Sequence, residues 1–149
     1  MYVRQLAVLA AIASLTGCTT PTQARFDAEV DRLCAIDGGN HVFETVVLPS
    51  NRFDKQGYPD FMSFKDGKMT LGADFLARNT LTELSTHGDN GPSLRKYVFE
   101  VERVSDYKVL GRKVFYFRLG GDAISLLPSG HDCGSPKADI LKQIFLPKE

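Results

Sequence analysis

The fold is decided by residues 94–119, which read LRKYVFEVERVSDYKVLGRKVFYFRL. In the first half of this stretch apolar and charged side chains alternate, which is typical of a β-strand with one buried face. The apolar face comprises Tyr97, Phe99 and Val101, and the charged face comprises Glu100 and Glu102. We therefore predict a strand over residues 94–104 that packs its aromatic side on a core.

A second alternating segment covers residues 113–119, and Leu110-Gly111 in front of it permits a turn. Its two faces comprise Phe115, Phe117 and Leu119 on one side and Val114, Tyr116 and Arg118 on the other. We expect two neighbouring antiparallel strands with aromatic inner faces, and Arg118 on the outer face with Glu100 or Glu102. The register is open, and a shift of one residue would exchange the two faces.

Two further segments have the composition of strands. Residues 41–48, HVFETVVL, are rich in β-branched side chains and end at Pro49. Asp66-Gly67 separates two short strand-like runs, which is the signal of a β-hairpin with a two-residue turn. The expected cross-strand pairs are Phe64 with Met69 and Met62 with Leu71. Within residues 72–93, residues 73–84 have mixed spacing and fit either a short helix or an irregular strand, and the turn-forming residues 87–92 predict a loop.

We expect a helix at each end of the domain. The first has Thr22 as its N-cap and Gly38-Gly39 as its stop. Its apolar stripe comprises Phe26, Val30, Leu33 and Cys34. The second follows Ser135-Pro136, an N-cap and first-turn proline. Its apolar residues are Ile140, Leu141, Ile144 and Phe145. These patterns predict an α+β fold with an N-terminal helix, an antiparallel sheet of about five strands and a short C-terminal helix.

Gly120-Gly121-Asp122 ends the second aromatic strand. Two successive glycines indicate positive φ, a bulge or the close approach of another backbone. We interpret these three residues as a structural turn, because the nucleotide-binding patterns GxGxxG and GxxxxGK are absent from the chain.

The first 17 residues have the character of an export leader. Arg4 precedes an uncharged apolar run at residues 6–15, which is too short to span a bilayer but suits a signal peptide. Leu15-Thr16-Gly17-Cys18 then resembles the lipobox of bacterial lipoproteins, an aliphatic residue and two small residues before a cysteine. The resemblance implies cleavage before Cys18 and its acylation, which would hold the protein to a membrane; an ordinary signal peptide with a chance cysteine is the alternative. Thr19 stands where an Asp favours inner-membrane retention in such lipoproteins, so the resemblance favours the outer membrane and a domain that faces the periplasm.

Cleavage would leave 132 of the 149 residues, enough for one domain. We expect residues 18–24 to form a short lipidated tether and residues 25–149 to form a single α+β domain. With Cys18 acylated, Cys34 and Cys133 remain in an oxidising compartment, where pairing is the default. We predict one disulfide between them; two free thiols are the alternative.

The charge balance argues against nucleic acid as a partner. The chain has 18 basic and 18 acidic residues, so removal of the leader with Arg4 would leave a net charge of about −1, whereas nucleic-acid binding favours a basic surface. The three histidines lack the spacing of a zinc site, and no cofactor motif is present. We therefore expect neither a metal nor a cofactor.

Two kinds of function fit these features. Residues 49–60 form a long polar loop, and such loops are enriched in function; a plain surface loop is the alternative. Its candidate contacts are Arg52, Asp54, Lys55 and Tyr58. We expect this loop to bind an envelope protein. The competing hypothesis is a small enzyme acting on cell wall or lipid, which would use His87, His131 and Asp132.

The chain beyond the leader also loosely resembles small lipoproteins of bacteria and their prophages. The shared features are an early helix ending in Cys34-x-x-Asp37-Gly38-Gly39, a valine-rich strand, a late strand that runs into Gly120-Gly121-Asp122, and a cysteine before a short final helix. The resemblance implies the disulfide and the architecture but no activity. A prophage exclusion or accessory lipoprotein is a third possible role.

Overall fold

The structure is a computed structural model, in which residues 20–89, 91–121, 129–134 and 139–149 are described. Its helices are α2 (Pro21–Asp37), η2 (Ser50–Arg52) and α3 (Ile140–Ile144). Its strands are β1 (Gly39–Val42), β2 (Val46–Leu48), β3 (Met62–Lys65), β4 (Lys68–Leu71), β5 (Phe75–Thr86), β6 (Ser93–Arg103), β7 (Lys108–Leu119), β8 (Gly130–Asp132) and β9 (Phe145–Pro147). The expected leader, Cys18, Asp122 and Ser135-Pro136 lie outside the described residues.

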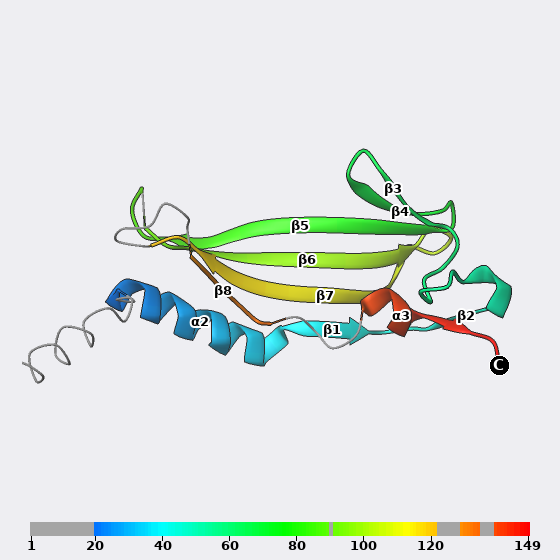
Figure 1. Cartoon of the computed structure of the whole chain (residues 1–149), viewed down its shortest axis with the longest axis horizontal. Helices are drawn as coiled ribbons and strands as arrows, with labels where there is room; N and C mark the ends of the chain where they lie inside the picture. Colours follow the sequence, from blue (N-terminus) through cyan, green and yellow to red (C-terminus); the bar gives the residue numbers. More distant parts are fainter. Residues whose placement is uncertain (1–19, 90, 122–128, 135–138) are drawn as a thin grey trace, which may run out of the picture.

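Seven of the described strands form one antiparallel sheet in the order β1-β7-β6-β5-β4-β3, with β8 also paired to β7. β1 and β8 lie on the same side of β7, at different points along it. β2 and β9 form a separate parallel pair. Figure 1 shows β5, β6 and β7 as three long strands, with α2 along one half and α3 at the other end. The α+β class is confirmed, and the expected count of about five strands is too low.

β6 and β7 form the expected antiparallel pair, but the predicted turn is wrong. The turn spans residues 104–107, where Tyr107 has φ 58°. Leu110-Gly111 lies inside β7 instead. A Cβ on Gly111 would come 2.9 Å from Cδ1 of Ile144, so this glycine allows the close approach of α3 rather than a change of chain direction.

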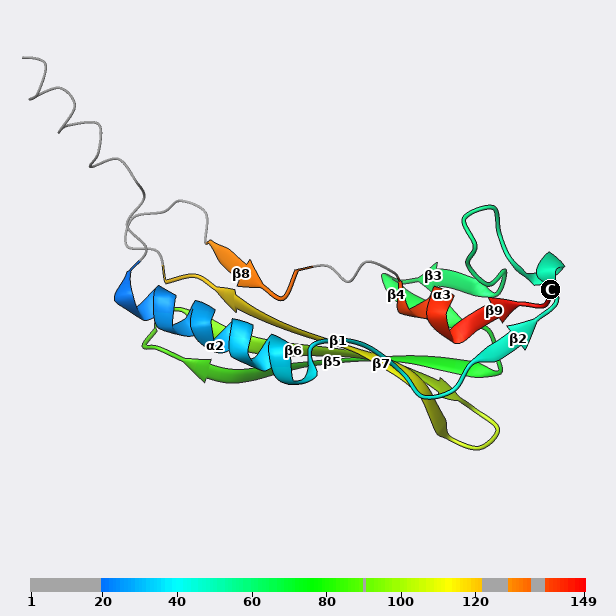
Figure 2. The same cartoon turned by 90° about the horizontal axis from the view of Figure 1, so that it is seen from below.

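The long sheet carries a core cluster on each face. One cluster contains Phe99 of β6 together with Leu71, Val101, Leu110, Ile140, Leu141, Ile144 and Phe145. The other joins Val30 of α2 to Leu94, Val114 and Tyr116. Successive side chains of a strand point to opposite faces, so Phe99 and Leu94 of β6 point in opposite directions. Figure 2 shows α2 near one end of the long strands, and α3 with the β3–β4 hairpin near the other.

The outer face predicted for β7 is wrong. Phe115 does lie opposite Tyr97 on a shared face, as expected. The set expected on the outer face, Val114, Tyr116 and Arg118, is nevertheless buried. It is buried because α2 covers this side of the sheet. The alternation in the sequence predicts one buried face for β7, whereas residues of β7 belong to both core clusters, Leu110 to one and Val114 and Tyr116 to the other.

α2 begins earlier than predicted. Its N-cap is Thr20, whose Oγ1 accepts a hydrogen bond from the Gln23 N–H at 3.1 Å, while Gln23 Oε1 accepts one from the Thr20 N–H at 2.9 Å. Pro21 lies in the first turn, so residues 21–24 belong to the helix and not to a tether, and Thr22 is not the N-cap. The predicted stripe is confirmed, because Val30 is fully buried and Phe26, Leu33 and Cys34 pack against the same cluster.

The β3–β4 hairpin is confirmed in the predicted register, with Phe64 opposite Met69 and Met62 opposite Leu71. Asp66 and Gly67 have φ of 51° and 72°, as a type I′ turn requires. The strand expected over residues 41–48 is divided into β1 and β2. The whole of β5 lies within residues 72–93, so this segment forms the strand and not the helix. α3 begins after the N-cap Asp139 and buries the four predicted apolar residues, with Phe145 opening β9.

The predicted disulfide is confirmed. It joins Cys34, in the last turn of α2, to Cys133, immediately after β8, with the two Cα atoms 5.5 Å apart. Both cysteines pack against the cluster that lies between α2 and the sheet. The bridge therefore fastens the C-terminal end of α2 to the edge of the sheet that β8 forms.

Candidate functional site

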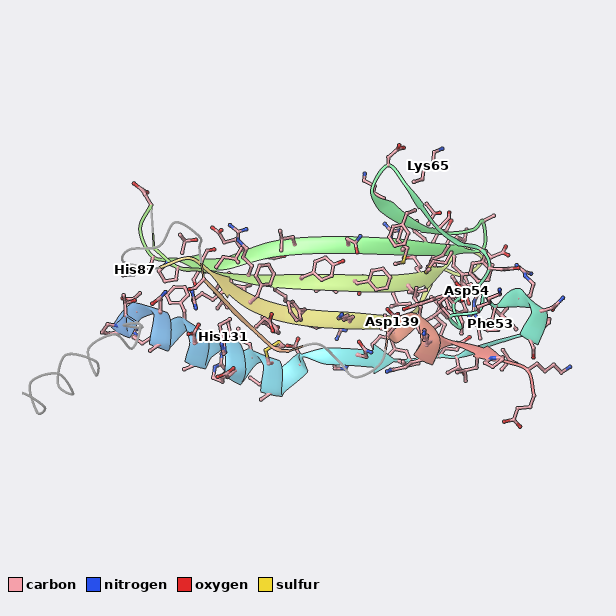
Figure 3. The ribbon with its side chains drawn as sticks, viewed as in Figure 1. Phe53, Asp54, Lys65, His87, His131 and Asp139 are labelled. Atoms are coloured by element: carbon pink, nitrogen blue, oxygen red, sulfur yellow. A yellow bond between two sulfur atoms is a disulfide. The ribbon has the colours of Figure 1, made fainter. Side chains whose placement is uncertain are left out.

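The loop at residues 49–60 is tied together by its own polar side chains. Arg52 Nε donates to both carboxylate oxygens of Asp60, at 2.8 and 3.0 Å. Asp54 Oδ1 accepts from the backbone N–H groups of Gln56 and Tyr58, at 2.9 and 2.8 Å. Figure 3 shows Asp54 close to α3, on the same side of the molecule as Asp139.

The same loop is fastened to the C-terminal helix. The Tyr58 hydroxyl lies 3.5 Å from an Asp139 carboxylate oxygen, and Lys142 Nζ lies 4.4 Å from the centre of the Tyr58 ring. The negative charge of Asp139 and burial raise the pKa of the Tyr58 hydroxyl. Three of the four predicted contact residues, Arg52, Asp54 and Tyr58, are thus engaged within the fold, and Lys55 is exposed. The binding role of this loop stays a prediction.

The histidines of the enzyme hypothesis do not come together. His131, on β8, lies 2.8 Å from a carboxylate oxygen of Asp31, and Asp132 accepts from the backbone N–H of Gly134 at 2.6 Å. His87 lies beyond the end of β5 and lines a different cavity from His131. Across the described part of the chain, no three His, Cys, Asp or Glu side chains are grouped as a metal site requires. His87 therefore does not share a site with His131 and Asp132, as the enzyme hypothesis would require.

The predicted turn at Gly120-Gly121 has a structural function. Both residues have positive φ, of 76° and 88°. A Cβ on Gly121 would come 2.8 Å from Cδ of Pro92, so a side chain of another segment, rather than a backbone, lies close to this glycine. Beside the turn, Arg118 is 4% exposed and its guanidinium pairs with Asp27 of α2 and donates to the Gly120 carbonyl at 2.5 Å. This charged pair holds α2 on β7.

A second polar junction holds the other end of α2. Asp37 accepts from the Tyr116 hydroxyl at 2.6 Å and from Lys96 Nζ at 3.0 Å. Burial raises the pKa of the Asp37 carboxyl, but the hydrogen bonds from Tyr116 and Lys96 outweigh burial and hold this pKa below its ordinary value. His41 lies next to this junction, with Nε2 2.8 Å from the Asp37 carbonyl oxygen. The residues around the Asp37-Gly38-Gly39 sequence therefore fix α2 to the sheet.

β5 leaves a long edge without a neighbouring strand. It pairs with β6 from Phe75 to Thr86, but with β4 only through Phe75 opposite Leu71. Beyond that pair, no strand among the described residues lies against its outer edge. Figure 1 shows this free edge along the top of the sheet.

The free edge has only part of the usual protection. Proteins commonly shield an edge strand by shortness, proline, charged side chains such as lysine, a bulge or a covering element. The opposite edge of the sheet follows this rule, because β1 and β8 have four and three residues. β5 is long, with 12 residues and neither proline nor lysine, and its charged residues are Arg78 and Glu83. Leu81 and Leu84 are 58% and 44% exposed. A bulge between Glu83 and Ser85 is the only irregularity in its pairing with β6.

A cleft of about 540 Å³ lies between α2 and the end of β5 and β6. Phe26 of α2 and Leu94 of β6 line its apolar part. Arg25, Arg32 and His87 are the basic side chains that line it, and Glu29 is the acidic one. Ser85 of β5 also lines the cleft, so the cleft and the free edge share one strand.

Sequence reasoning missed both surfaces. The spacing of residues 72–93 gave no clear strand signal, and an edge is a property of the sheet order rather than of the strand itself. The cleft is built from α2 and the β5–β6 turn, which are far apart in the chain. Only the run of turn-forming residues around His87 could have placed that residue at the end of two strands.

Comparisons with known proteins assign no family. No protein-family model matches the chain, and no curated protein or solved structure has a significant match to it. None of the helices in the described residues has the length and apolar composition that crossing a membrane requires.

Proposed function

We propose that the protein is a lipoprotein, anchored through Cys18 in the outer membrane, whose domain binds an envelope protein at the free edge of β5. The lipobox-like Leu15-Thr16-Gly17-Cys18 supports the anchor. A stable anchor needs more than one acyl chain, which the modification expected at Cys18 would supply. The partner contributes an extended segment that pairs with β5 as an added strand.

The observation that carries this proposal is the long outer edge of β5, which has no neighbouring strand beyond Phe75 among the described residues. Its backbone N–H and C=O groups on that side have no strand partner among the described residues. Main-chain hydrogen bonds to an added strand would supply affinity, and side chains next to the strand would supply specificity. Leu81, which is 58% exposed, favours a partner segment with an apolar residue beside it.

The test is crosslinking in living cells, with a photoreactive residue placed at Thr82 on β5 or at Lys55 in the loop of residues 49–60. We expect one dominant envelope protein to be captured from Thr82. Position Ala35, on the exposed side of α2, is the control. Capture from Lys55 but not from Thr82 would place the binding site in the loop of residues 49–60. Capture of a second copy of this chain would contradict the proposed envelope partner.

A pair of proline substitutions tests the role of the backbone. Thr80 and Leu81 are neighbours in β5, and the N–H groups of successive residues in an antiparallel strand point to opposite sides. One of the variants Thr80→Pro and Leu81→Pro therefore breaks a bond to β6, whereas the other removes only an outward N–H. The variant that keeps its thermal unfolding midpoint should lose the crosslink from Thr82. Undiminished capture by that variant would show that strand addition does not occur.

A further inference from the structure

The cleft between α2 and the end of β5 and β6 has the size of a small-molecule site. Its volume of about 540 Å³ falls within the range of about 300–1,000 Å³ that is usual for such sites. Leu94 is 3% exposed and Phe26 is partly buried, so the apolar part of the lining belongs to the core cluster of α2. A hydrocarbon chain in the cleft would therefore contact mainly Phe26, with Leu94 buried beneath it.

The charges that line the cleft differ in their pairing. Arg32 donates to both carboxylate oxygens of Glu29, at 2.7 and 2.8 Å, so the charges of these two residues balance. Arg25 is exposed, and no carboxylate among the described residues pairs with it. His87 also lines the cleft, with the two arginines. One positive charge is therefore left beside an apolar surface.

We propose that this cleft binds a fatty acid, with its acyl chain against Phe26 and Leu94 and its carboxylate at Arg25. The carboxylate supplies the negative charge that Arg25 lacks, and a charge-assisted hydrogen bond is stronger than a neutral one. A neutral alcohol of the same chain length would leave Arg25 unpaired. This site is independent of strand addition at the outer edge of β5.

The experiment uses the full chain in phosphatidylcholine vesicles and a palmitate that carries a photoreactive diazirine. Mass spectrometry of the labelled protein should place the label on α2 and on the segment from Ser85 to Leu94. Arg25→Gln should lower this labelling about tenfold. Arg78→Gln is the matched control, because Arg78 is an exposed arginine of β5 that pairs with Glu102 outside the cleft.

Two further measurements separate the cleft from general lipid contact. Unlabelled palmitate should compete for the label, and hexadecanol should compete about tenfold less well. Ala28→Trp places a large ring in the cleft from an exposed helix position and should abolish labelling while the thermal unfolding midpoint is kept. Equal labelling of the Arg25 and Arg78 variants, equal competition by the alcohol, or label spread over the whole surface would each overturn the proposal.

Discussion

Asp37 joins α2 to the sheet through hydrogen bonds from Tyr116 and Lys96. Because these bonds hold the pKa of its carboxyl below the ordinary value, the charged form stabilises the folded state. Asp37→Asn should lower the free energy of unfolding by about 1–3 kcal/mol at neutral pH, since a hydrogen bond to a charged group is lost or weakened. Urea unfolding of the two proteins measures this difference.

The same pair of proteins makes a prediction about pH. The folded-state pKa of Asp37 is lowered, so its contribution is fully present above the unfolded pKa and is lost as the pH falls through the folded pKa. The difference between the native protein and Asp37→Asn should therefore shrink below about pH 4. Glu83→Gln is the control, because the Glu83–Arg95 pair is largely exposed and should contribute less than about 1 kcal/mol. A difference that stays constant down to about pH 2 would show that the charge of Asp37 has no role.

Among the elements, those that depend on neighbouring residues in the chain could be predicted from the sequence. Those that depend on contacts between distant segments could not. The type I′ hairpin at Asp66-Gly67 depends on two backbone angles that Asp and Gly adopt easily, so its register was predictable. The position of the β6–β7 turn was not predictable, because Gly111 makes room for the His41 carbonyl oxygen and for Ile144, and both residues lie far from it in the chain. The free edge and the cleft likewise depend on which elements become neighbours. The sequence therefore predicted the fold class, the hairpin and the disulfide better than it predicted the candidate site.

The contact between β7 and α3 gives a prediction for these two elements. Gly111→Ala would bring a Cβ to 2.9 Å from both the His41 carbonyl oxygen and Ile144 Cδ1, and such overpacking costs about 1–3 kcal/mol. Ile144→Val removes the Cδ1 atom, so the double variant should be less destabilised than the sum of the single ones by about 0.5 kcal/mol or more. Gly130→Ala is the control, because its nearest neighbour would be an ordinary contact at 3.5 Å. If the effects of Gly111→Ala and Ile144→Val on the free energy of unfolding were strictly additive, contact with Ile144 of α3 would not be the reason that position 111 requires glycine.

At the scale of the whole molecule, the two core clusters lie on opposite faces of one long sheet and depend on different elements. The cluster around Phe99 is closed by α3, β9 and the β3–β4 hairpin. The cluster around Val30 is closed by α2, which is a single helix held by the Asp27–Arg118 pair, the Asp37 junction and the disulfide. We infer that α2 can open without loss of the sheet, and that the disulfide limits this opening.

Removal of the disulfide tests this division of the molecule. Cys34 and Cys133 are 99 residues apart in the chain, and loss of a native bridge in a small secreted domain typically costs about 2–5 kcal/mol. The double variant Cys34→Ala/Cys133→Ala should show this loss in urea unfolding. In hydrogen exchange, the amides of α2 should lose more protection than those in the centres of β6 and β7. Without the bridge, α2 can open by itself while the sheet stays folded. An equal fall in protection across α2, β6 and β7 would mean that the bridge acts only on the unfolded chain and that both clusters unfold together.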